Sequence, residues 1–139
     1  MTATIAALLS WASLISGYPE PDHLPTLEYQ PHAFFVKEAC GGQECKAVGW
    51  YNDKDVIYLD DRLRGENSTF ISSLIVHELV HYLQDYSGKF NTFSCADQIV
   101  REREAYAFQR EYVAKAHGEA QFQIMRPPMC LDKTAVRVR

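Results

Sequence analysis

The chain has 139 residues, of which 47% are hydrophobic and 23% charged, the composition of a globular protein long enough to bury a core. Its formal net charge is −4, and its basic residues cluster only at Arg101 with Arg103 and at Lys133 with Arg137 and Arg139. A nucleic-acid surface needs a larger basic excess, so the sequence predicts no nucleic-acid partner. The length predicts a single domain.

The first segment predicts a helix over residues 2–16, because its large apolar residues recur on one side of a helix. It has no basic start and no small-x-small cleavage pattern, so we expect a structural helix of a mature chain without a visible signal peptide. An uncleaved or partial signal peptide is the alternative. No stretch reaches the roughly 18 apolar residues that a membrane span requires.

The next part of the chain predicts a small antiparallel sheet. Residues 24–29 read as a short edge strand, and residues 32–36 are strand-like because they are aromatic and β-branched. Residues 47–51 and 56–59 flank Asn52-Asp53-Lys54-Asp55, a hairpin turn. With the helices before and after it, this sheet indicates an α+β fold.

Four cysteines, Cys40, Cys45, Cys95 and Cys130, allow three disulfide pairings. Cys40 and Cys45 flank a glycine-containing loop, so we expect them to pair locally and Cys95 to pair with Cys130. Disulfides favour an oxidising compartment, and therefore a secreted or periplasmic protein. Four reduced cysteines are one alternative, and a structural zinc site is a weaker one because a second closely spaced pair is missing.

A long helix is predicted over residues 68–86, with Asn67 or Ser68 as its N-cap and Gly88 as its stop. It contains His77-Glu78-Leu79-Val80-His81, in which the two histidines lie one turn apart on one helix face. Two imidazoles in this arrangement predict half of a zinc site. Glu78 leaves the helix at another angle, where it would act as general base toward a water that the metal activates.

A catalytic zinc site needs a third protein ligand, which the sequence offers on a last helix predicted over residues 95–117. The metzincin pattern is excluded, because Gln84 and Ser87 stand where its glycine and third histidine would be. Among the acidic residues of the last helix, Glu104 shares a face with Val100, Ala107 and Phe108, whereas Glu102 lies roughly 200° away. This pattern favours Glu104 over its competitors Glu102 and Glu111.

The two histidines followed by a glutamate on a downstream helix resemble the gluzincin zinc metallopeptidases. The resemblance covers about a third of the chain. It implies a zincin-like metallopeptidase domain over residues 1–139, with zinc held by His77, His81 and Glu104 and with Glu78 as general base. Peptides or proteins would then be the substrates. A catalytically inactive zinc-binding domain and a disulfide-stapled interaction domain are the alternatives.

Other roles at this site stay open at the level of the sequence. Asp97 could serve as an aspartate ligand but reads better as a charge at a helix start. Asp85 could hydrogen-bond a ligand imidazole. Four residues are available to stabilise an oxyanion: Tyr86, Tyr106, Tyr112 and His117. By analogy with zincin folds, the strand before the zinc helix, Val56 to Asp60, would be the wall along which a peptide binds.

Overall fold

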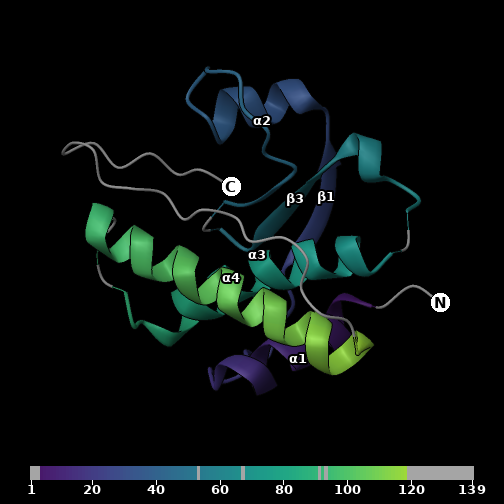
Figure 1. Ribbon diagram of the computed structural model, residues 1–139. Helices are drawn as coiled ribbons and strands as arrows, with labels where there is room; N and C mark the ends of the chain where they lie inside the picture. Colours follow the sequence, from purple (N-terminus) through teal and green to yellow (C-terminus); the bar gives the residue numbers. More distant parts are fainter. Residues whose placement is uncertain (1–3, 53, 67, 91, 93, 119–139) are drawn as a thin grey trace.

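The computed structural model describes residues 4–52, 54–66, 68–90, 92 and 94–118 (Figure 1). In chain order they form helix α1 (Ile5–Ser16), strand β1 (Thr26–Gln30), helix α2 (His32–Glu38), strands β2 (Gly49–Tyr51) and β3 (Val56–Asp60), a short 3-10 helix η1 (Asp61–Leu63), and helices α3 (Thr69–Ser87) and α4 (Cys95–His117). The predicted α+β class is confirmed.

The described sheet has three strands in the order β1-β3-β2, and it is mixed rather than antiparallel throughout. Strand β2 runs antiparallel to β3, as the predicted hairpin requires, but β1 runs parallel to β3. A parallel pair needs a long crossover between its strands, and the segment from β1 to β3, which includes α2, supplies it. Strand β3 is therefore central, with a partner on each edge.

Helix α2 replaces the strand that was predicted over residues 32–36. Pro31 is the N-cap residue and has an extended conformation, and the helix begins at the next residue, His32. Phe35 is fully buried, and the ring of Phe34 lies 4.6 Å from that of Tyr58 and 6.0 Å from that of Trp50. Aromatic residues predict a strand by composition, but here they pack a short helix on the sheet.

The sheet separates α2 from the three longer helices. Ile57 and Leu59 of β3 are fully buried in the core with α3, whereas Tyr58 and Trp50 of the opposite face contact α2. This division arises because successive side chains along a strand point to opposite faces of the sheet. Helices α1, α3 and α4 lie together on the first side (Figure 1), so α3 is enclosed between the sheet and two other helices.

Helix α1 confirms the predicted N-terminal helix and belongs to the core. Thr4 caps its start and Gly17, in left-handed conformation, ends it. Leu8, Leu9 and Ala12 are almost fully buried against α3 and α4. Across the described residues, no helix combines the length and the apolar character that crossing a membrane would require.

The predicted disulfide between Cys40 and Cys45 is present and closes the loop that follows α2. Cys95, the first residue of α4, is also disulfide-bonded, while its predicted partner Cys130 lies outside the described residues. These bonds are consistent with an oxidising compartment.

Candidate metal centre

Helix α3 carries both histidines of the motif in its most buried part. Ser68 caps the helix, as one of the two alternatives predicted, by accepting a hydrogen bond from the Ile71 N–H at 3.3 Å; the other alternative, Asn67, lies outside the described residues. Every residue from 75 to 84 is buried, because the sheet, α1 and α4 surround this stretch. His77 and His81 are 4% and 1% exposed, and their ring centroids lie 5.0 Å apart. The one-turn spacing thus places two imidazoles side by side in the interior.

Glu102 of α4 completes a group of three. Its Oε1 lies 3.0 Å from Nε2 of His77 and 3.1 Å from Nε2 of His81, and Glu102 is itself 4% exposed. The three ligand atoms lie within 4.8 Å of one another. Two imidazole nitrogens and one carboxylate oxygen that converge in this way can hold a metal ion, and this donor set suits zinc among other divalent metals.

Glu104, the predicted third ligand, points to a different set of partners. Its Oε1 accepts hydrogen bonds from the Tyr18 hydroxyl at 2.5 Å and from Nε2 of Gln84 at 3.1 Å, and its Oε2 pairs with Nζ of Lys89 at 2.6 Å. Burial raises the pKa of Glu104, but the bonds from Lys89, Tyr18 and Gln84 outweigh it and lower that pKa. The structure therefore brings Glu102, and not Glu104, to the two histidines.

The face of α4 explains why the sequence favoured Glu104 over Glu102. Val100 and Ala107, which share a helix face with Glu104, are exposed. The buried side of α4 is half polar and half apolar: it carries Gln98, Arg101 and Glu102 and then Ala105, Tyr112 and Val113. These positions recur every three or four residues, but apolar residues alone do not trace them.

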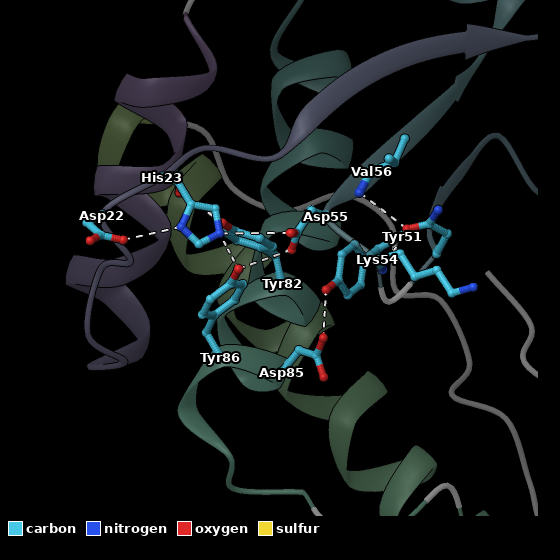
Figure 2. Close-up of polar contacts among 10 residues, drawn as sticks. Asp22, His23, Tyr51, Lys54, Asp55, Val56, Tyr82, Asp85 and Tyr86 are labelled. Carbon is cyan, nitrogen blue, oxygen red and sulfur yellow. Dashed lines mark hydrogen bonds and ion pairs between the residues drawn. The ribbon is translucent and has the colours of Figure 1, made fainter.

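Two glutamines that the sequence did not single out as site residues contact the outer nitrogens of the imidazoles. Oε1 of Gln84 lies 2.9 Å from Nδ1 of His81, and Oε1 of Gln109 lies 2.9 Å from Nδ1 of His77. Asp85, which was considered for this role, instead accepts a hydrogen bond from the Tyr51 hydroxyl at 2.8 Å (Figure 2). Helical spacing is the one sequence signal for these two glutamines. Gln84 follows His81 by three residues and Gln109 lies two turns after Glu102, so each shares a helix face with a member of the group of three.

Glu78 is buried at the edge of the sheet and is not one of the three converging groups. It is 3% exposed, and its Oε1 accepts a hydrogen bond from the Tyr51 backbone N–H at 2.9 Å. A Cβ placed on Gly49 would lie 3.5 Å from its Oε2. The carboxylate of Glu78 thus lies against strand β2.

Among the four residues considered for an oxyanion donor, Tyr106 lies beside the group of three. Its ring centroid is 4.5 Å from that of His77. Tyr112 shares a hydrogen bond with His117 at 2.9 Å, and Tyr86 contacts His23 (Figure 2).

The fold corrects one further expectation, on strand β3, and agrees with another, on Asp97. Strand β3 cannot add a peptide strand, because β1 and β2 pair with both of its edges. Asp97 lies in the first turn of α4, where its Oδ2 accepts a hydrogen bond from the Thr92 hydroxyl at 2.5 Å. It serves as the charge at a helix start that the sequence favoured over a ligand role.

Comparisons with protein-family models, with curated proteins and with solved structures found no match to this chain.

Proposed function

We propose that the chain is a gluzincin-like, zinc-dependent peptidase domain in which His77, His81 and Glu102 hold the metal and Glu78 is the general base. The observation that carries this proposal is that three possible ligand atoms converge in the interior. Oε1 of Glu102 lies 3.0 Å from Nε2 of His77 and 3.1 Å from Nε2 of His81. Burying such a group is costly unless a cation or protons lie among its members. Three protein ligands also leave a fourth position open, as catalytic zinc sites do.

Zinc at this position would lower the pKa of a water molecule and polarise a substrate carbonyl. Glu78 would accept the proton of the attacking water and pass it to the leaving amine. The Tyr51 N–H supports this role, because its hydrogen bond to Oε1 fixes the orientation of the carboxylate. Tyr106, beside His77, is the residue we propose for stabilising the oxyanion.

The outer edge of β2 is the place we propose for an extended peptide substrate. Asp60 N donates to Val48 O and Asn52 N donates to Val56 O, so alternate residues of this segment bond to β3. The backbone groups of Gly49 and Tyr51 consequently point away from β3, on the side where Glu78 lies. A peptide that added to this edge would pair without the Tyr51 N–H, which donates to Glu78, and would run past the general base.

Metal content of the purified protein tests this proposal first. Wild type and Glu102→Gln are dialysed against zinc, and Glu111→Gln is the matched control, since Glu111 lies on the same helix but pairs with Lys115 at 2.8 Å. We expect one zinc per chain in wild type and control, and a clear loss in Glu102→Gln.

A peptide-library digest, with Glu78→Gln as the inactive control, then tests the peptidase reaction. Cleavage that requires zinc and Glu78 supports the proposal. Zinc binding without cleavage leaves a catalytically inactive zinc-binding domain, and no stoichiometric metal leaves the disulfide-stapled interaction domain.

A further inference from the structure

The outer nitrogens of both candidate ligand rings face side-chain amides. Gln84 contacts Nδ1 of His81 and Gln109 contacts Nδ1 of His77, each through its Oε1 at 2.9 Å. An amide oxygen only accepts hydrogen bonds, whereas an amide nitrogen only donates them. The orientation of each amide therefore decides which imidazole nitrogen carries a proton.

The orientation of Gln84 follows from two acceptors on α4. Its Nε2 lies 3.0 Å from the backbone oxygen of Arg101 and 3.1 Å from Oε1 of Glu104. Neither the carbonyl oxygen nor the ionised carboxylate can donate, so the amide nitrogen must face them. The amide oxygen then faces His81, and Nδ1 of that ring must hold a proton.

The orientation of Gln109 follows from a serine hydroxyl. Oγ of Ser73 lies 2.8 Å from the backbone oxygen of Phe70, to which it donates its single proton. The Ser73 oxygen must then accept from Nε2 of Gln109, which lies 3.1 Å away. The oxygen of Gln109 is left facing His77, whose Nδ1 holds a proton in turn.

We propose that Gln84 and Gln109 are positioning residues that hold both imidazoles with Nδ1 protonated, so that both rings present Nε2 to the point next to Glu102. This inference builds on the proposed metal site and adds how its ligand atoms are selected. Both positioning groups are neutral, so neither adds negative charge to the ligand rings, and Glu102 is the one anionic member of the group of three. A divalent ion held there would keep more of its positive charge than it would if carboxylates, in place of the two amides, contacted the ligand rings.

Glu104 also has a role in this arrangement. Lys89 and Tyr18 hold its carboxylate, which accepts the amide proton of Gln84. The glutamate that the sequence suggested as a ligand thus acts on His81 through one intervening side chain.

Nuclear magnetic resonance of protein with ¹⁵N-labelled histidine tests the proposal. Long-range proton–nitrogen spectra of the metal-free protein report whether each Nδ1 is protonated. Spectra of ¹¹³Cd-loaded protein report which nitrogen couples to the metal. We expect a protonated Nδ1 in His77 and His81, and coupling through Nε2 in both.

The variants are Gln84→Leu, Gln109→Leu and the conservative Gln109→Glu, with Gln43→Leu at an exposed position as control. Each leucine variant should lose the protected Nδ1–H signal of its own histidine only, and should weaken zinc binding about 10- to 100-fold. Gln109→Glu keeps an acceptor and should restore both the signal and the affinity.

An unprotonated Nδ1 in wild type, coupling of the metal through Nδ1, or leucine variants with unchanged spectra would overturn the proposal. The metal-free spectra decide this point even if no peptidase activity is found, so the two proposals can fail separately.

Discussion

Exchange of Glu102 for glutamine is the most informative single change, because it separates the ligand that the structure indicates from the one that the sequence favoured. Glu102→Gln keeps the volume of the side chain and one acceptor oxygen but removes its charge. Glutamine is a poor zinc ligand, so one of the three proposed ligands is lost. The buried position, 4% exposed, leaves little room for another side chain to replace it.

The loss of zinc affinity in Glu102→Gln follows from the share of the binding free energy that one ligand contributes. Binding free energies of about 10–16 kcal/mol for four-ligand zinc sites correspond to about 2.5–4 kcal/mol per ligand. Loss of one ligand should therefore weaken zinc binding about 10²- to 10³-fold, at about 1.4 kcal/mol per factor of ten. At a zinc concentration of about 1,000 times Kd, wild type gains about 4 kcal/mol of stability, and the variant gains about 1 kcal/mol.

Thermal unfolding with and without zinc measures this difference. A chain of this length gains about 3–4 °C in Tm per kcal/mol, so zinc should raise Tm by about 14 °C in wild type and by about 3 °C in Glu102→Gln. Glu104→Gln, which disturbs His81 only through Gln84, should lose at most about tenfold in affinity and keep a shift of about 9 °C. A full zinc shift in Glu102→Gln together with its loss in Glu104→Gln would refute the reasoning.

Three other changes test separate parts of the molecule. Glu78→Gln should keep its zinc but lose about 10²- to 10⁴-fold in kcat in a peptide-cleavage assay, and equal activity would exclude Glu78 as the base. Replacing both Cys40 and Cys45 by serine opens a short loop and should cost about 2 kcal/mol in a urea titration, a cost that would vanish if the bond did not form in the native protein. The pKa of Tyr18 is raised from 10.0 to about 12 by burial and by the adjacent Glu104, so its contribution to stability is complete below pH 10 and is lost as the pH rises through about 12. Tyr18→Phe should therefore flatten the alkaline side of the stability–pH curve, measured by urea unfolding at each pH, and an unchanged curve would contradict this assignment.

The sequence by itself determined the local parts of this protein. The four-residue spacing of His77 and His81 places both on one face of α3 whatever surrounds that helix. Ser68 and Gly88 bound the same helix through hydrogen bonds with residues three positions away, Ile71 and Asp85. The pairing of Cys40 with Cys45 is likewise local, because five residues of separation hold the two close.

Only the tertiary structure decided which residues meet across elements. Glu102 and Glu104 are two residues apart in the first half of α4, where the buried side carries Gln98, Arg101 and Glu102, so hydrophobic periodicity gives no reliable signal there. Packing of α4 on α3 turns Glu102 toward the histidines and leaves Glu104 with Tyr18 and Lys89. The parallel pairing of β1 with β3 also depends on contacts distant in the chain.

The two amides show the same dependence most clearly. Gln84 and Gln109 are unremarkable polar residues in the sequence, and their roles arise from a backbone oxygen on α4 and a hydroxyl on α3 that fix which way each amide faces. Hydrogen-bond direction depends on partners that the fold brings together from separate helices. The pair of imidazoles is therefore a local property of α3, whereas the carboxylate that meets them and the orientation of the two amides are properties of the packed α3–α4 pair.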